Sequence, residues 1–298
     1  YWGGPVCIEE VTFAPIVADQ GRYEAFDAGQ FEAVYLRDPM LIQRSMDDGV
    51  GGYDTYQNSQ NVLLLNGGAS ESPANDVAVR QAVAHAIDSE QLKERDFQGA
   101  GSARTSIIGP DSRYAAGQEG PAHDVEAATA LVEEAKSAGW DGNLEMVCAQ
   151  SSQDVALTLE AQMESVGMTI DITLLPDFTA LIDQVGVRKE FDVACWGLNG
   201  LDEGLWATLN SSLVSTSPSN YGGLADPAID TAMDELRVAI DDEATEAALA
   251  DLQEALNEAV PTVPLYHGFN RVVHTDELVG TTPTGNSLVF FSTAFLEQ

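Results

Sequence analysis

Histidines, cysteines and carboxylates are the side chains of this chain whose chemistry could serve catalysis or hold a metal. The 298 residues include 48 Asp and Glu, 4 His and 3 Cys. No G-x-S-x-G, H-E-x-x-H, P-loop or G-x-G-x-x-G pattern occurs. The two closest histidines, His267 and His274, do not have the spacing of metal ligands. The sequence therefore predicts no catalytic residue, no metal site and no cofactor.

The cysteines allow two interpretations. Cys7, Cys148 and Cys195 are widely spaced and form neither CxxC pairs nor a dense disulfide framework. Cys148 and Cys195 occupy similar places in two predicted strands, so a bridge between them is one interpretation. We favour the other, buried free thiols, because such thiols behave as small hydrophobic residues.

The charge of the chain excludes two classes of partner. The formal net charge is -35, from 13 Lys and Arg against 48 Asp and Glu. A field of this sign repels nucleic-acid phosphates and anionic lipid headgroups, which excludes nucleic acid and the membrane surface as partners. We interpret the acids chiefly as a solvated surface, with attraction of cationic solutes as the alternative. No apolar run reaches the roughly 18 to 20 residues of a membrane span.

Strand and helix patterns alternate in the centre of the chain. The predicted strands are 144–150, 169–176 and 191–197, and the helices between them are 154–167 and 177–190. This alternation predicts βαβ units, right-handed crossovers and a mainly parallel sheet. Ligands of open α/β sheets bind at the carboxyl ends of the strands. The run FDVACW places Trp196 at that edge.

The flanking segments are less regular. The first part predicts a strand at 9–16, a helix at 19–29, a strand at 31–36 and a glycine-rich irregular connection at 47–56. After NVLLLN (61–66), the stretch 75–92 predicts a small-residue helix with Arg80 at the border of its apolar stripe. We interpret Arg80 as a structural ion-pair partner. The remaining predictions are an irregular segment at 99–121, helices at 124–139, 225–241 and 243–259, and short strand-like runs in the tail from 270 onward.

Five segments, taken in order, resemble family 5 of the solute-binding proteins of bacterial ABC importers, the dipeptide, oligopeptide and nickel-binding group. They are NVLLLN with NDVAVRQAVAHAID, HDVEAATALVEEAKSAGW, FDVACWGLNGLDEGLWATL, NYGGLADPAIDTAMDEL and VPTVPLYHGFNRVVH, within residues 61–275. Each segment is weak evidence alone, whereas five in the family's order are specific. Residues 1–36 resemble the segment in which the family's chain returns to its first lobe.

The resemblance implies an α/β, periplasmic binding protein-like fold of type II, with a mainly parallel sheet in one lobe and part of a second lobe. Residues 1–60 would belong to the first lobe, 61–275 would form the second, and 276–298 would return to the first. Crossing segments near 56–62 and 268–276 would act as the hinge. A full-length member has a few hundred residues before this point, including a secretion signal and part of the ligand site.

The resemblance also implies ligand-binding residues. In peptide-binding members a Trp follows a strand, and an Asp three residues later pairs with the amino group of the peptide. The matching residues here are Trp196 and Asn199, and an amide supplies no negative charge for an ammonium group. Asp202 can take over this role, Trp206 can wall the pocket, and Tyr221 in NYGG is a weaker candidate. The alternative is that Trp196 and Trp206 only cap the sheet.

Two expectations about the solute follow from Asn199. Either the solute is not an ordinary short peptide, which we favour narrowly, or a peptide or other cationic solute is held by Asp202. In both cases the resemblance implies a binding protein that captures a small-molecule or peptide solute and delivers it to ABC permease subunits, without catalysis.

The same resemblance implies a place and an assembly state. The expected location is extracytoplasmic, in the periplasm or on the cell surface, with a monomer tethered to the membrane only through an amino-terminal part, as in a lipoprotein. The alternatives are a secreted acidic hydrolase without a recognisable motif and a ligand-sensing module of a receptor.

Overall fold

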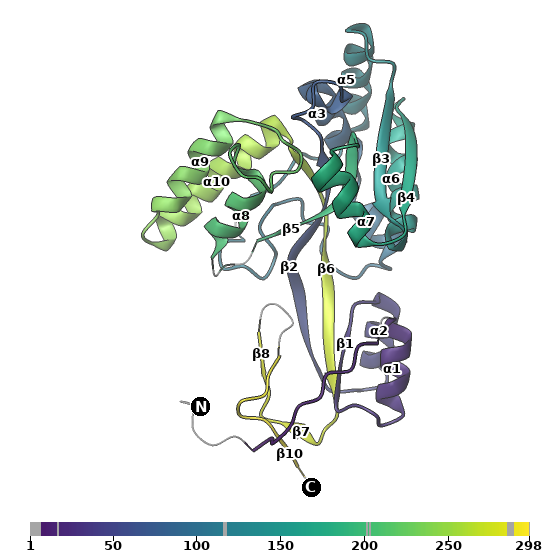
Figure 1. Cartoon of the computed structure of the whole chain (residues 1–298), viewed down its shortest axis with the longest axis vertical. Coiled ribbons are helices and arrows are strands. Elements are labelled where there is room, and N and C mark those ends of the chain that lie inside the picture. The colour runs from purple at the N-terminus through teal and green to yellow at the C-terminus, as the bar shows by residue number, and fades with distance from the viewer. Residues whose placement is uncertain are drawn as a thin grey trace.

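The computed structural model of the chain describes residues 7–16, 18–115, 118–200, 202, 204–284 and 289–297. Figure 1 shows a large upper lobe and a smaller lower lobe joined by two long strands. Segments from both ends of the chain, 12–16 and 289–291, meet in the small lobe. None of the described helices is long and apolar enough to cross a membrane.

One six-stranded sheet runs through both lobes in the order β1-β6-β2-β5-β3-β4. Its strands are β1 (Ala33–Leu36), β2 (Gly52–Leu65), β3 (Asn143–Ala149), β4 (Thr169–Leu175), β5 (Val193–Asn199) and β6 (Thr262–His274). β3 pairs in parallel with β4 and β5, as the βαβ alternation predicted. The pairings of β2 with β5, β2 with β6 and β1 with β6 are antiparallel. The sheet is thus parallel only in β5-β3-β4, because β2 enters the large lobe and β6 leaves it.

The connection between the lobes is narrow. β5 pairs with β2 only from Ser59 onward, and β1 pairs with β6 only from Arg271 onward. Around the pair Tyr56 and Phe269 the sheet consists of β2 and β6 alone, and the register of these strands shifts between Tyr56 and Gln60. A two-stranded ribbon with a bulge bends more readily than a full sheet.

Aspartates begin most helices of the large lobe. The side chains of Asp76, Asp88, Asp124, Asp226 and Asp241 each accept a backbone N–H of the following first turn. These helices are α3 (Val77–Ala86), α4 (Ser89–Asp96), α5 (Val125–Ser137), α9 (Pro227–Val238) and α10 (Asp242–Ala259). The large lobe also contains α6 (Gln153–Ser165), α7 (Phe178–Ile182), α8 (Leu205–Leu213) and the short helical turns η1 (Pro73–Asn75), η2 (Gln150–Ser152) and the π-helical η3 (Asp183–Arg188).

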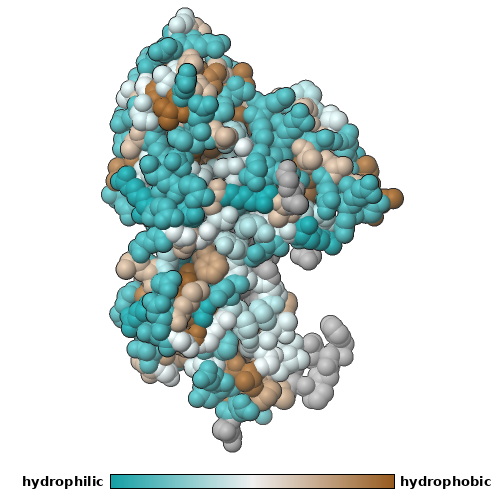
Figure 2. Space-filling view, turned by 180° about the vertical axis from the view of Figure 1, so that it is seen from behind, coloured by the Kyte–Doolittle hydropathy of each residue, from teal (hydrophilic) through white to brown (hydrophobic). Residues whose placement is uncertain are grey.

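Two large apolar cores and a smaller one beside α7 and η3 fill the large lobe. One large core lies between the sheet and the helices α3 to α6 and includes Leu63, Met146 and Leu159. The other large core lies under α8, α9 and α10 and includes Leu209 and Leu252. On the face that Figure 2 shows, the surface of this lobe is mostly hydrophilic, which agrees with the interpretation of the acids as a solvated surface.

The small lobe contains α1 (Asp19–Asp27), β1, α2 (Pro39–Asp47) and the lower halves of β2 and β6. Four short strands complete it: β7 (Leu278–Val279), β8 (Thr282–Pro283), β9 (Val289–Phe290) and β10 (Phe295–Leu296). Its core consists of Tyr23, Phe26, Leu36, Leu41, Ile42 and Val273.

The amino-terminal part departs from the sequence predictions in two places and contains one helix that was not predicted. Residues 9–16 form no strand, although EEVTFAPI has apolar and β-branched residues. The helix α2 was missed, although Asp38 caps it and Pro39 occupies its first position. The connection predicted at 47–56 is shorter than expected because β2 already begins at Gly52, where it pairs with β6. Pairing with a distant strand overrides the weak local preference of a glycine-rich segment.

Candidate ligand-binding cleft

A cleft of about 720 Å³ opens at the carboxyl ends of β3 and β5, where the large lobe faces the small lobe. Open α/β sheets bind ligands at this edge. Most of the lining comes from the large lobe, and Arg37 comes from the small lobe. The lining residues are Arg37, Asn61, Val62, Leu64, Ala149, Ser151, Ser152, Val155, Phe178, Leu181, Ile182, Cys195, Trp196, Gly197, Leu198, Ser211, Ser212, Ser219, Tyr221, Leu265 and Tyr266.

The cleft begins where β3 and β5 separate. The ladder between these strands has only two pairs, Met146 with Val193 and Val147 with Ala194. By contrast, β3 pairs with β4, and β5 with β2, over seven residues each. The disulfide between Cys148 and Cys195 joins β3 and β5 at the next position, with the Cα atoms 4.8 Å apart. It therefore holds β3 and β5 together at the point where the two strands separate and the cleft opens.

The favoured interpretation of Cys148 and Cys195 as free thiols is wrong. The two residues occupy equivalent positions on neighbouring parallel strands, which brings them within bonding distance. The sequence contains the similar positions but does not show that these two strands are neighbours. Cys7 is the free cysteine, and it is exposed.

Three aromatic residues, Phe178, Trp196 and Tyr221, form one side of the cleft, and we call them the aromatic wall. The Phe178 and Trp196 rings lie 5.6 Å apart between centroids at an interplanar angle of 31°. The Tyr221 ring meets Trp196 edge-on, with centroids 5.4 Å apart. Phe178 comes from the start of α7, Trp196 from β5 and Tyr221 from the segment after α8. Phe178 was missed at first because an exposed aromatic after an Asp cap looks like any helix start.

The segment that follows α7 contacts Tyr221 and holds it in position. The Lys189 ammonium donates to the backbone carbonyl of Tyr221 at 2.7 Å and lies 5.3 Å from the centroid of its ring. Burial lowers the pKa of Lys189 below its usual value. A Cβ on Gly186, in the π-helical turn η3, would lie 3.3 Å from Tyr221 Cε1, so a side chain there would push against the ring. Gly186 of η3 and Lys189 thus set the position of Tyr221.

The cleft lining carries little charge. Arg37 is the only charged side chain among the lining residues that the structure describes. Tyr266 lies nearby on β6 and stacks on Phe97, with 3.9 Å between ring centroids. Burial raises the pKa of Tyr266, and the positive charge of Arg37 acts in the opposite direction. Tyr266 therefore contributes a neutral hydroxyl at physiological pH.

Asp202 does not line the described cleft. Its carboxylate accepts hydrogen bonds from the Ser112 hydroxyl and, at 3.1 Å, from the Arg113 backbone N–H. These contacts tie the segment after β5 to the long segment between α4 and α5. The geometry favours a structural role for this carboxylate, and its predicted role as a partner for a cationic solute stays a prediction.

The other two predicted ligand residues lie at either end of the segment after β5. Asn199 is the last residue of β5 and pairs with Ser59 of β2, while its side chain lies outside the described residues. Trp206, in α8, donates from its indole to the Met233 carbonyl at 3.1 Å and packs on the core under α9 and α10. Trp206 is not among the cleft-lining residues, whereas Trp196 and Tyr221 are.

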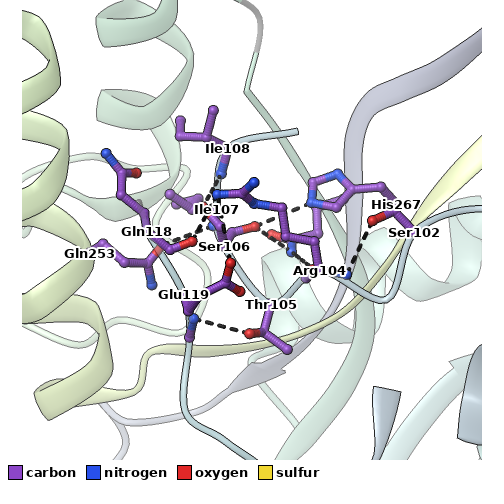
Figure 3. A network of polar contacts seen from close by, with 12 residues as sticks. Ser102, Arg104, Thr105, Ser106, Ile107, Ile108, Gln118, Glu119, Gln253 and His267 are labelled. Atoms are coloured by element: carbon purple, nitrogen blue, oxygen red, sulfur yellow. Dashed lines mark hydrogen bonds and ion pairs between the residues drawn. The ribbon is translucent and has the colours of Figure 1, made fainter. Parts of the chain in front are cut away.

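The segment between α4 and α5 is irregular, as predicted, yet it is held tightly (Figure 3). The Ser106 carbonyl accepts from Gln60 Nε2 at 2.7 Å and from His267 Nε2 at 3.2 Å. The Ile107 N–H donates to Gln253 Oε1 of α10 at 3.0 Å. These side chains supply the hydrogen bonds that the backbone of an irregular segment does not obtain from a neighbouring strand. They also hold in place the turn that reaches Asp202.

Arg80 is structural, but its partners differ from the expected carboxylate. It is buried, and its guanidinium donates to the carbonyls of Ala259 at 2.7 Å, Ala74 at 2.9 Å and Asn75 at 2.8 Å. Burial lowers the pKa of Arg80 from its usual value. The arginine joins the carboxyl end of α10 to η1, where unpaired carbonyls collect.

Comparisons with known proteins agree with this architecture. Protein XP55 from Streptomyces lividans is 24% identical over an alignment 298 residues long, and this alignment covers 93% of this chain and 52% of that protein. The solved structure of NikA from Brucella suis with Fe(III)-EDTA has a TM-score of 0.79 and 22% identity, covering 100% of this chain and 64% of that one. The dipeptide binding protein from Pseudoalteromonas sp. SM9913, solved with Met-Leu, has a TM-score of 0.81 and 18% identity, covering 100% and 60%.

These structures share the fold of type II periplasmic binding proteins, which is the fold of this chain. The chain spans about half the length of protein XP55 and under two thirds of the two solved chains. Residues 1–220 match the model of the bacterial extracellular solute-binding proteins, family 5 Middle. The chain belongs to family 5 of the bacterial extracellular solute-binding proteins.

Proposed function

We propose that this chain is the ligand-capturing part of a substrate-binding component of an ABC importer, which binds a small solute outside the cytoplasmic membrane and delivers it to the permease. The observation that carries the proposal is the cleft at the carboxyl ends of β3 and β5, with Trp196 and Tyr221 in its lining. Membership of family 5 supports the same role. The proposal assigns no catalytic step.

The two long strands supply a plausible mechanism of capture. We place the hinge at the crossing segments near 56–62 and 268–276, which include the narrow ribbon around Tyr56 of β2 and Phe269 of β6 and the register shift that follows Tyr56. Residues 1–60 and 276–298 then form part of the first lobe, and 61–275 form the second. Bending of the ribbon would bring Arg37 of the small lobe against a solute that rests on the large lobe. Closure around the solute would create the form that the permease recognises.

The relatives bind different solutes. The Brucella protein was solved with Fe(III)-EDTA and the Pseudoalteromonas protein with Met-Leu, so the family does not fix the solute class. For this chain, we propose Trp196, Asn199, Asp202, Trp206 and Tyr221 as the residues to test. Trp196 and Tyr221 have the strongest support because both line the cleft.

Calorimetry of the natural protein, with any sequence that flanks these 298 residues, tests the proposal. A panel of di- to pentapeptides, neutral sugars and metal chelates should contain at least one solute that binds. Trp196→Leu should weaken that binding about five- to tenfold, because an aromatic contact contributes on the order of 1 to 1.5 kcal/mol. Trp140→Leu is the control, since Trp140 lies in the same lobe but not in the cleft.

Small-angle scattering with and without the solute tests closure. A smaller radius of gyration in the bound state supports capture between lobes. Turnover of a peptide or glycoside, instead of reversible binding, would contradict the proposal and favour a hydrolase. Binding to Trp196→Leu with unchanged affinity would also contradict it.

A further inference from the structure

The aromatic wall stands in a part of the cleft where the described residues place no carboxylate. The whole chain has 48 Asp and Glu, yet the lining residues that the structure describes include neither residue type. We propose that the large lobe selects a solute that carries an uncharged ring, either a sugar ring or an aromatic ring. This ring of the solute stacks on Phe178, Trp196 and Tyr221. The inference rests on the proposed function and names the solute class for the same cleft.

The wall offers ring faces that a flat solute can reach. The Phe178 side chain is 57% exposed, and it leans over Trp196 with ring centroids 5.6 Å apart. Trp196 is held in place because Val62 of β2 pairs with it on one side and the disulfide at Cys195 fixes the strand on the other. A flat solute can stack on this fixed ring by sharing or displacing the exposed Phe178 ring. Stacked and edge-on aromatic pairs are favourable at this spacing.

A cationic group would find no partner at the wall. Asp202, the nearest predicted anion, already accepts from Ser112 and Arg113. The Lys189 ammonium lies against the Tyr221 ring, so a second cation at this ring would be repelled. The net charge of -35 attracts cations at long range, but salt screens exposed charges beyond about 8 to 10 Å. Burial of an unpaired ammonium costs several kcal/mol.

Polar groups next to the wall are neutral. Ser151, Ser152, Ser212 and Ser219 line the cleft, and Asn61 adds an amide. Hydroxyls and amides both donate and accept hydrogen bonds, which suits the hydroxyls of a sugar or the amides of a blocked peptide. The only charged side chain of the described lining, Arg37, belongs to the small lobe and would favour an anionic or neutral group at the far end of the solute.

Matched pairs of solutes test the inference on the natural protein. An aromatic dipeptide is compared by calorimetry with its N-acetylated, C-amidated form, and a neutral disaccharide series is measured beside them. Blocking should change the affinity by no more than about threefold, because no carboxylate at the wall pairs with the amino group. The dipeptide arm and the disaccharide arm distinguish an aromatic ring from a sugar ring.

Variants of the wall give the second readout. Phe178→Ala should weaken the bound ring solute about tenfold, as expected for the loss of one aromatic contact. Val187→Ala is the matched control, because Val187 is 72% exposed on the adjoining turn and does not line the cleft. Both substituted side chains are exposed, so unchanged thermal unfolding is expected for both variants.

Three outcomes would overturn the inference, and they separate it from the proposed function. If the free dipeptide binds and its blocked form binds more than about a hundredfold more weakly, recognition is cationic and only the inference fails. If Phe178→Ala leaves every affinity unchanged, the wall is not a stacking surface and again only the inference fails. If no peptide, sugar or chelate binds at all, the proposed function fails and the inference fails with it.

Discussion

The two lobes differ in how much apolar core they bury and in how they hold a buried arginine. Among the residues that the structure describes, the two main cores of the large lobe contain 26 and 18 buried apolar residues, whereas the core of the small lobe contains six. Arg80 of the large lobe is satisfied by three backbone carbonyls, and Arg271 of the small lobe pairs with the Asp54 carboxylate at 2.5 and 2.6 Å. The large lobe therefore holds its buried arginine through the carbonyls of element ends, whereas the small lobe holds its own chiefly through a carboxylate.

This contrast implies two stabilities in one chain. A core of six residues contributes much less apolar burial than one of 26, so the small lobe should open at a lower free energy. Its surface also carries exposed apolar side chains, Phe13, Phe290 and Phe295 among them. Hydrogen exchange should show slower exchange in β3 and β5 than in β1 and α1.

Removal of the disulfide should have the largest effect. Cys148→Ala combined with Cys195→Ala opens a loop of 47 residues, which should lower the free energy of unfolding of the large lobe by about 4 kcal/mol. Denaturant unfolding followed by Trp fluorescence measures the change. Cys7→Ala is the control and should change nothing, because Cys7 is exposed and free. Equal free energies of unfolding for the double variant and the native chain would show that the disulfide does not stabilise the large lobe.

Replacement of Arg80 should come next. Arg80→Met retains much of the volume but leaves the carbonyls of Ala74, Asn75 and Ala259 without their donor, at a cost of about 3 kcal/mol. The loss should be the same at low and high salt, because the partners are carbonyls. Arg237→Met, on the exposed face of α9, is the control and should stay within about 0.5 kcal/mol. A strong salt dependence of the Arg80 effect would point to an ionic partner instead.

The ion pair of the small lobe should give a smaller and more local effect. Asp54→Asn leaves the buried Arg271 without its anion and should cost about 2 kcal/mol, below the usual cost for a buried pair because Asp54 is 37% exposed. Hydrogen exchange should accelerate in β1 and in the lower halves of β2 and β6, with no change in β3 and β4. Acceleration that extends to β3 would contradict the independence of the two lobes. Asp47→Asn, on the exposed side of α2, is the control.

The sequence predicted the large lobe better than the small one, for a physical reason. Strands and helices of the large lobe carry complete local signals, such as the Asp cap and the apolar period of α5 between 124 and 139. In the small lobe, β2 owes its first residues to pairing with β6, more than 200 residues away, and residues 9–16 have strand-like composition without a partner. Local preference cannot report a partner that is distant in the chain.

The cleft shows the same limit. The FDVACW pattern predicted Trp196 near the carboxyl end of a strand, although β5 continues to Asn199, and Tyr221 followed from the family resemblance. The disulfide and the contact of Asp202 with Ser112 depend on which strands and segments are neighbours, which periodicity does not reveal. Phe178 reached the cleft because α7 packs beside β3 and β4, and no motif marks it.

The smallest expected effect concerns a carboxylate of the large lobe, one of whose oxygens accepts no hydrogen bond from the described residues. Asp96, at the carboxyl end of α4, accepts from the Thr158 hydroxyl at 3.1 Å, while its second oxygen is buried without a partner in the described part of the chain. Burial raises the pKa of this carboxyl, the Thr158 hydrogen bond and the Arg95 charge act in the opposite direction, and the Asp154 charge adds to the rise. A helix carboxyl end also disfavours a negative charge.

The sign of the resulting pH dependence follows from linkage. Because the folded pKa lies above the unfolded one, the carboxyl of Asp96 stabilises the fold fully below the unfolded pKa of about 4, and this contribution is lost as the pH rises through the folded pKa. Asp96→Asn should therefore raise the melting temperature at pH 7 by about 1 to 2 °C and have no such benefit near pH 4. Asp251→Asn, at an exposed site on α10, is the control and should shift neither value. A lower melting temperature for Asp96→Asn at pH 7 would mean that the carboxylate has a partner, and the contrast between a compensated Arg271 and an uncompensated Asp96 would disappear.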